Sequence, residues 1–342
     1  MDRWDRQQFF ARLASLDQDQ LAKTLWTVYW KGTREMRQRI EAELDPETTR
    51  RRQAASAQTP DPEGTLDEVT EFVTLARAGA YMGGDRRVKP SERTRWRFEF
   101  RRLVKEAGTA LADPDPGPGA EAMEHLLDLA RETGRYDYFR SDDPIEAARI
   151  VVSDEVELLW ARLRRHLDFQ AFARRVAPQL LRWESGHGWT RSGFGRVAES
   201  ERPLAAVLEP LLTASDSWVT FADRYLEALE GAAGSEAKVR QDAWNREHRR
   251  GERARDLALW HSMMLQHLLG GEGEDRMERL VASQAISGPK VLFIRARLAL
   301  GRGEVAKARQ MAGALIHKAP GQPEFLDLAR ELKVAPVDPS GS

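Results

Sequence analysis

The chain has 342 residues, of which 41% are hydrophobic and 31% charged, and its formal net charge is −1. This length allows a sizeable core, and the composition suits a soluble, charge-rich helical protein rather than a disordered chain. There is no cysteine, which excludes disulfides, thiolate metal ligands and cysteine nucleophiles. The near-zero net charge excludes a global attraction to nucleic acid or membrane.

The N-terminus and the apolar runs bear on location. The first ten residues, MDRWDRQQFF, lack the apolar core of a signal peptide. No apolar run approaches the roughly 20 residues that are needed to cross a bilayer. These features predict a cytoplasmic protein with no membrane partner.

The first part of the chain predicts a small helical module followed by a linker. Residues 1–45 have the spacing of three short helices, with Asp17 and Gln20 as a capping-box-like start for the second and Thr33 as a cap for the third. Residues 46–64 contain three prolines and an arginine triplet but no apolar periodicity, so we interpret them as a linker.

Residues 65–183 predict a central helical domain. Helix starts are expected at Thr65, Ser91 and Asp154, and a stronger one at Asp143, where Pro144 takes the first helical position. Pro178 is expected to kink or end the last helix. Apolar stripes at helical spacing run through the domain and include Phe72, Trp96, Phe100, Leu126, Val156 and Trp160.

The rest of the chain divides into a Gly-rich loop at 184–202, a C-terminal helical domain at 203–333 and a flexible tail at 334–342. Gly251, within a very polar run, predicts that the helical stretch from Ser235 to Leu269 forms two pieces. No run of alternating β-branched residues predicts a strand. The expected fold class is therefore all-α: a solenoid-like, multi-helix array of antiparallel helical pairs.

The best-organised stretch is residues 289–320, two helical segments hinged at Gly301 and Gly303. Its small residues allow two antiparallel helices to approach closely. The spacing resembles one tetratricopeptide (TPR) repeat over about a tenth of the chain, although Arg295 stands where that family usually has a large apolar residue. The resemblance implies a protein or peptide partner and supplies no functional residues beyond the framework. The framework positions are matched by Leu292, Ala296, Ala299, Ala308, Ala312, Leu315 and Pro320.

No coherent catalytic or metal-binding signature is present. The seven histidines form neither an HExxH motif nor an i, i+4 histidine pair, and Glu121 with His125 is interpreted as a surface pair. An enzyme built on the acidic turn 137–143 and the loop 186–196 is kept as a third hypothesis, because hydrolases use paired carboxylates in loops. We predict that the chain is not an enzyme and takes no cofactor and no metal.

The leading hypothesis is a non-catalytic adaptor or scaffold that binds another protein. The Gly-rich loop presents aromatic side chains among glycines, and aromatic residues commonly anchor interfaces. The residues predicted to contact the partner are Trp189 and Phe194 in that loop, with Arg295 and Arg302 in the helical pair.

A basic segment supports an alternative, a subunit of a nucleoprotein assembly. Residues 86–105 hold nine Lys or Arg against two Glu, and the acidic residues 106–134 that follow offer a structural explanation by charge pairing. Otherwise the arginines are suited to phosphates, and the interleaved aromatic residues to stacking on bases. The residues predicted to bind nucleic acid are Arg86, Arg87, Arg93, Arg95, Arg97 and Arg101.

Overall fold

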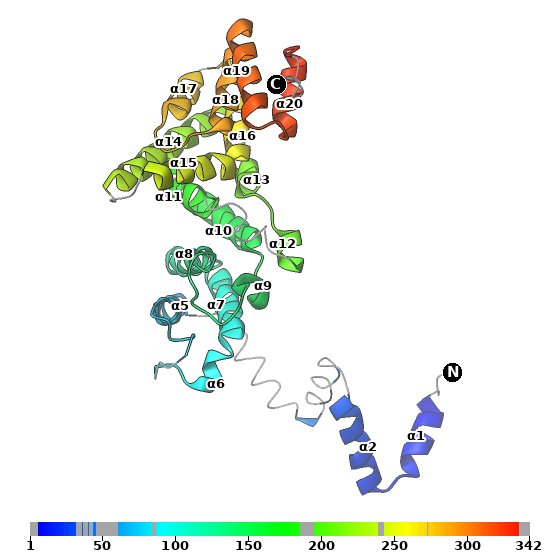
Figure 1. The fold of residues 1–342 in the computed structure, drawn as a ribbon. Helices are drawn as coiled ribbons and strands as arrows, with labels where there is room; N and C mark the ends of the chain where they lie inside the picture. The colour runs from blue at the N-terminus through cyan, green and yellow to red at the C-terminus, as the bar shows by residue number, and fades with distance from the viewer. Residues whose placement is uncertain are drawn as a thin grey trace. The chain divides into compact units, whose positions relative to one another are not determined.

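A computed structural model of the chain describes residues 6–31, 36, 40, 44–45, 61–83, 87–184, 195–238, 243–271 and 273–334. Every regular element within these residues is a helix, and none is a strand, which confirms the predicted all-α class. The chain divides into two compact units, Met1–Thr59 and Pro60–Ser342 (Figure 1). The finer boundaries expected at residues 45, 64, 183, 202 and 333 stay predictions.

The first unit contains the helices α1 (Arg6–Ala14) and α2 (Gln18–Lys31). The backbone amide of Gln20 donates to Oδ1 of Asp17 at 2.7 Å, and the amide of Asp17 donates to Oε1 of Gln20 at 3.2 Å. The predicted capping box is therefore confirmed. The third predicted helix falls on residues 33–44, most of which lie outside the described part of the chain.

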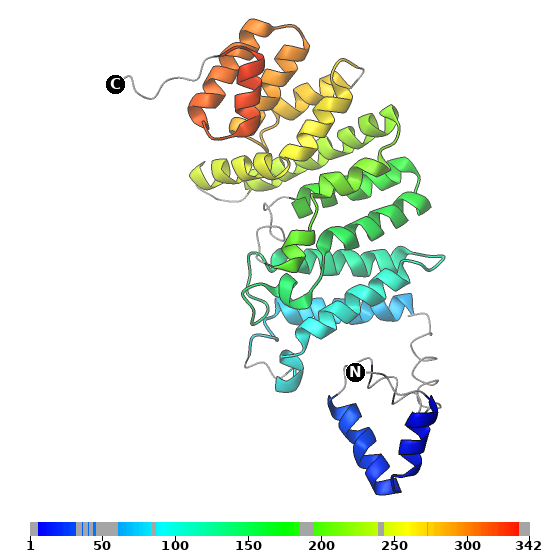
Figure 2. The same ribbon diagram turned by 90° about the vertical axis from the view of Figure 1, so that its right-hand side faces the viewer.

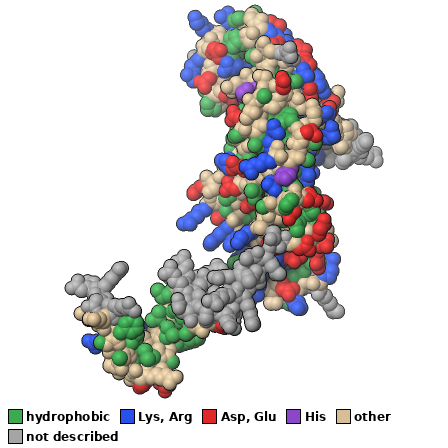
Figure 3. All heavy atoms as spheres, turned by 180° about the vertical axis from the view of Figure 1, so that it is seen from behind, with side chains coloured by type: hydrophobic (Ala, Val, Ile, Leu, Met, Phe, Trp, Pro, Cys, Tyr) green, Lys and Arg blue, Asp and Glu red, His purple; other side chains and the backbone are tan. Residues whose placement is uncertain are grey.

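Apolar side chains of the first unit lie at its surface (Figure 3). Phe10 is 55% exposed and Trp26 is 60% exposed, although their helical spacing predicts that they face a core. Trp26 stacks on Trp30 of the same helix, with ring centroids 5.8 Å apart. The two short helices of this unit contribute too little apolar surface to bury aromatic side chains of this size between them.

The second unit contains all the remaining described helices, which Figure 2 shows as successive layers. None of the described helices is both long enough and apolar enough to cross a membrane. In chain order they are α5 (Pro62–Arg77), α6 (Pro90–Arg93), α7 (Trp96–Ala110), α8 (Gly117–Glu132), α9 (Pro144–Ala148), α10 (Val152–His166), α11 (Phe169–Glu184), α12 (Arg196–Ser200), α13 (Leu204–Leu208), the 3-10 helix η1 (Glu209–Leu211), α14 (Ser215–Lys238), α15 (Ala243–Asp256), α16 (Ala258–Leu268), α17 (Glu274–Ala282), α18 (Pro289–Gly301), α19 (Val305–Lys318) and α20 (Pro323–Glu331).

Helices of the second unit pack mainly on their neighbours in the sequence. Helices α5, α7 and α8 pack together, and α8 also contacts α10. Helix α11 lies along α14, which contacts α16 and α17, and both of these contact α18. Helix α18 pairs with α19, and α19 contacts α20. This order follows from short connections, which place consecutive elements side by side.

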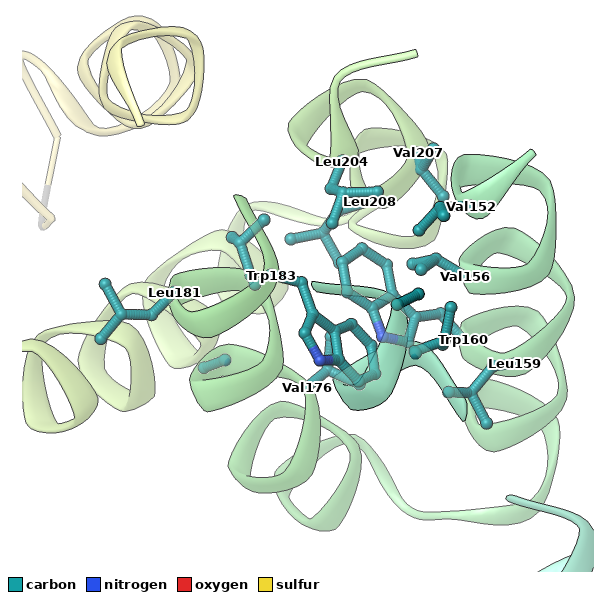
Figure 4. Close-up of a cluster of buried hydrophobic side chains, with 14 of the residues drawn as sticks. Val152, Val156, Leu159, Trp160, Val176, Leu181, Trp183, Leu204, Val207 and Leu208 are labelled. Carbon is teal, nitrogen blue, oxygen red and sulfur yellow. The ribbon is translucent and has the colours of Figure 1, made fainter. Parts of the chain in front are cut away.

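One apolar core extends through the second unit from Val69 on α5 to Leu298 on α18. Figure 4 shows the part of this core between α10, α11 and α13, where Trp160 and Trp183 lie with ring centroids 6.3 Å apart. The indole Nε1 of Trp160 donates to Oε1 of Gln179 at 2.8 Å. The buried polar group of this tryptophan is therefore satisfied.

A second, smaller core lies between α18, α19 and α20. It contains Phe293 and Ala296 from α18, Ala312 from α19 and Phe325 from α20. Ala299 of α18 also belongs to this smaller core, whereas Val291, Ile294 and Leu298 of the same helix belong to the larger core. Helix α18 therefore has apolar side chains on two sides, one for each core.

Prolines move two helix starts upstream of the positions expected from capping residues. Pro62 opens α5 three residues before Thr65, and Pro90 opens α6 with Lys89, not Ser91, at the N-cap. Proline suits the first helical position because its missing N–H would have no helical partner there. The helix expected to start at Ser91 is in fact two helices, α6 and α7, separated by residues 94–95.

At Asp143 the predicted start is confirmed, since its carboxylate accepts a hydrogen bond from the amide of Glu146 at 2.9 Å. At Asp154 the prediction is two residues late, because α10 begins at Val152. Here the carboxylate of Glu201 accepts from the amides of Val152 and Ser153 at 2.6 and 2.9 Å. A cap supplied from a distant segment leaves no local signal in the sequence.

Two expected interruptions do not break their helices. Pro178 lies inside α11, which continues to Glu184, so of the two expected outcomes, a kink or an end of the helix, the end is wrong. The residues that follow the proline are buried in the core, and this packing outweighs the lost backbone hydrogen bond. Gly251 lies inside α15, and the break comes instead at Leu257, the N-cap of α16.

Gly119 on α8 marks a close approach to the end of α7. A Cβ at this position would lie 2.6 Å from the carbonyl carbon of Ala110 and 2.7 Å from the nitrogen of Leu111. We expect Gly119→Ala to destabilise the fold by about 1–3 kcal/mol through overpacking. Gly231→Ala on α14, where a Cβ meets nothing within 4 Å, should instead stabilise it by up to about 1 kcal/mol. Urea unfolding of both variants measures these changes in stability. Midpoints that shift in the same direction would contradict the close approach at Gly119.

Candidate functional site

The helical pair expected at 289–320 is present. Helix α18 ends at Gly301, Gly303 turns the chain with a φ of 76°, and α19 begins at Val305. Pro320 follows the end of α19, and Pro323 takes the first position of α20. The predicted small framework residues are buried in the smaller core. These helix boundaries are confirmed, whereas the likeness to a TPR repeat stays a prediction.

Beside this pair lies a groove of about 690 Å³. One wall is α15, and the opposite wall is formed by the start of α18 and by the corner between α19 and α20. The residues that α15 contributes follow helical spacing and so share one face of that helix. They include Trp244, His248, Gly251 and Arg255.

An exposed aromatic pair forms one edge of the groove. Trp244 is 71% exposed and stacks on the ring of His248, with centroids 5.2 Å apart and planes within 3°. Nε2 of His248 lies 3.3 Å from Oε1 of Glu252, one helical turn further along α15. The edge therefore combines a large apolar surface with a carboxylate and an imidazole ring.

The opposite wall combines a cation with a buried ring. Phe325 is only 1% exposed, and Nζ of Lys290 lies 5.4 Å from the centroid of its ring while also pairing with Glu324. The hydroxyl of Ser287, which also lines the groove, is buried and has no hydrogen-bond partner among the described residues. Buried hydroxyls normally have a hydrogen-bond partner, so this hydroxyl is free to form a hydrogen bond with a ligand.

The groove is narrow where two glycines meet. A Cβ on Gly288 would lie 4.0 Å from Cα of Gly251, and Gly288 has a φ of 90°, which favours glycine. A Cβ on Gly251 itself would meet nothing within 4 Å. The space above Gly251 is therefore part of the groove, and a larger residue at this position would occupy it.

Two arginines predicted to contact a partner lie next to the groove helices but hold α17 in place. Arg295 donates to the carbonyl of Val281, and Arg302 pairs with Glu274 and Glu278. The hydrogen bond from Arg302 holds the pKa of Glu274 below its usual range. Trp189 and Phe194, the other two predicted contacts, lie outside the described residues. The partner-binding role of all four stays a prediction.

The basic segment is divided between two faces of α7. Arg102 pairs with Glu68, Glu99 and Glu106, so the predicted pairing with the acidic segment holds at Glu106. Other carboxylates of that segment pair with other helices, as Glu124 does with Arg175 of α11. Trp96 and Phe100 are 5% and 0% exposed, which confirms their predicted place on an apolar stripe and contradicts the alternative in which they stack on bases. They lie on the apolar face of the helix and pack in the core.

The other predicted nucleic-acid contacts are placed as follows. Arg93 donates to the carbonyl of Val88 at 3.0 Å, and Arg101 donates to the carbonyl of Ala148 at 2.7 Å. Arg87, Arg95 and Arg97 are exposed, and Arg86 lies outside the described residues. The predicted pair of Glu121 and His125 is present, with 3.7 Å between Oε1 and Nε2.

Within the described ranges, no three His, Asp or Glu side chains gather closely enough to hold a metal ion. In the acidic turn, Asp143 caps α9, while Asp137 and Asp142 are exposed. Searches against protein-family models, curated proteins and solved structures found no match to this chain. In the described part of the chain, the geometry is that of an all-helical protein with an open groove beside a C-terminal helical pair.

Proposed function

We propose that this chain is a non-catalytic, cytoplasmic adaptor, whose helices form a solenoid-like array and whose C-terminal groove binds a segment of another protein. The observation that carries this proposal is the groove between α15, α18 and α20 with the exposed Trp244 at its edge. The resemblance of residues 289–320 to a TPR repeat supports it, because such repeats bind protein segments. The absence of cysteine supports the cytoplasmic location.

The size and lining of the groove suit a peptide. Its volume of about 690 Å³ lies within the range of roughly 300–1,000 Å³ that is typical of ligand sites. Tryptophan is enriched among the residues that dominate binding energy. The lining also carries both signs of charge, with Glu247 and Glu252 on α15 and Arg255 and Lys290 beside them. A polypeptide segment with an apolar anchor and charged neighbours complements this surface.

Gly251→Gln tests the proposal by filling the groove without disturbing packing. Its Cβ meets nothing within 4 Å, and glutamine is a better helix former than glycine by roughly 0.5–1 kcal/mol. We therefore expect the variant to lose peptide binding while its unfolding midpoint rises. The measurement selects peptides from a random display library on the full chain and compares their affinities for the wild-type chain and the variant.

Two alanine variants complete this experiment. Trp244→Ala should weaken the binding of the selected peptides by about 30-fold or more, the loss typical of an aromatic residue that dominates binding energy. Tyr136→Ala, which removes a similarly exposed ring (58%) on the connection between α8 and α9, should leave the affinities unchanged. Selection of no peptide, or of peptides that bind Gly251→Gln as well as wild type, would show that the groove is not a peptide site.

A further inference from the structure

A row of cations follows the face of α7 that borders α9. Arg97, Arg101 and Lys105 are spaced four residues apart, so their side chains share one face at intervals of about 6 Å along the helix axis. Two hollows of about 390 and 290 Å³ flank this row. The hydrogen bond from Arg101 to the carbonyl of Ala148 lies where the end of α9 meets α7.

Both hollows are lined by cations. Arg93, Arg97 and Arg140 line the first, and Arg101, Lys105 and Arg149 line the second. We call these six residues the α7 basic face.

Among the described residues, a single carboxylate lines these hollows, that of Glu155 in the second. Burial, together with the nearby Asp154, raises the pKa of Glu155 to about 7, so this carboxylate is partly neutral near neutral pH. The positive charge of the face is therefore little offset from within the hollows.

Four cations of this face also lack ion pairs within the described part of the chain. No carboxylate there lies within 4.0 Å of Arg97, Lys105, Arg140 or Arg149, whereas Arg102 on the neighbouring face of α7 has three. Nε of Arg140 donates to the carbonyl of Met82 at 2.5 Å, which fixes the guanidinium without neutralising it. Uncompensated cations held close together favour the binding of a polyanion.

We propose that the α7 basic face binds the phosphate backbone of nucleic acid. The row from Arg97 to Lys105 is about 12 Å long, and a nucleic-acid strand presents a phosphate about every 3.4 Å along a duplex axis. Five of the six cations are arginines, whose planar guanidinium suits bidentate contact with phosphate. Trp96 and Phe100 are buried and do not stack on bases, so the binding has little sequence preference.

The test is duplex binding by the full chain as a function of salt. A labelled DNA duplex of about 30 base pairs with random sequence is titrated between roughly 50 and 200 mM NaCl, and its fluorescence anisotropy is followed. The double variant Arg97→Gln/Lys105→Gln should reduce the slope of log K against log salt by about 2 and weaken binding roughly 60-fold at 0.1 M salt. Neither side chain makes a described hydrogen bond or ion pair, so the variant should fold; Arg97 loses a contact with the ring of Phe98.

A matched control removes the same charge elsewhere. Lys307→Gln/Arg330→Gln acts on exposed side chains of α19 and α20, each paired with one carboxylate of its own segment, and should leave the slope unchanged. The proposal is overturned if the chain does not bind the duplex at the lowest salt, or if the two double variants lose the same duplex affinity. It is also overturned if polyglutamate of the same total charge displaces the duplex. Gly251→Gln should not alter duplex binding, so the groove and the α7 basic face are tested separately.

Discussion

Trp160→Ala should lower the free energy of unfolding by about 3–5 kcal/mol, which is the range for removing a buried tryptophan from a core. The side chain is 0% exposed and lies with Trp183 between α10, α11 and α13 (Figure 4). Its removal leaves a cavity and also leaves Oε1 of Gln179 without the indole donor. Because domains of this kind are stable by only about 5–15 kcal/mol, the variant should unfold at a much lower urea concentration.

The control for this variant is Trp244→Ala, the same substitution at a side chain that is 71% exposed. Its effect on stability should stay within about 0.5 kcal/mol, as for most surface substitutions. Equal midpoints for the two variants in urea would contradict the assignment of Trp160 to the core. If the stability of Trp244→Ala is unchanged, any loss of peptide binding by this variant does not come from unfolding.

Acidification from neutral pH to pH 5 should cost about 2 kcal/mol of stability through His261. This histidine is 0% exposed, and its Nε2 lies 2.7 Å from the hydroxyl of Tyr225. Burial lowers the pKa of His261 to about 3, whereas the unfolded chain takes up the proton near 6.5. Between these values the unfolded state binds more protons, so stability rises with pH. The stability contribution of His261 is fully present above about pH 6.5 and is lost as the pH falls toward about 3.

His261→Gln tests this contribution, because glutamine can keep a hydrogen bond to Tyr225 but does not titrate. We expect the unfolding free energy of the variant to depend less on pH between 7 and 5. The decrease in slope should equal the uptake of up to one proton on unfolding. Tyr225→Phe keeps His261 buried and should retain the slope. An unchanged slope in His261→Gln would mean that other groups cause the acid sensitivity.

The helices were largely predictable because their signals are local. Apolar stripes such as the one containing Val156 and Trp160, the capping box at Asp17 and the cap at Asp143 each depend on residues within one or two turns. The helix that continues through Pro178 was not predictable in the same way. Its persistence depends on burial against other helices, which a single segment does not reveal.

The candidate site was predictable only in part. The pair at 289–320 is visible in the sequence, but the opposite wall of the groove comes from α15, about 40 residues earlier. That helix has no apolar stripe, and its one unusual signal is Trp244 in a very polar run. On α7 the cations were visible, whereas their division between Arg102 on one face and the row on the other depends on which carboxylates the fold brings near.

The two apolar cores that meet on α18 have a consequence for cooperativity. Ile294 faces the larger core and Phe293 the smaller, so α19 and α20 can open as a separate unit while the larger core stays closed. The groove uses Phe325 and the corner between α19 and α20 on one side, and α15, whose Ala254 belongs to the larger core, on the other. A bound segment would therefore link the two cooperative units, and its binding energy would add to the local stability of the C-terminal end.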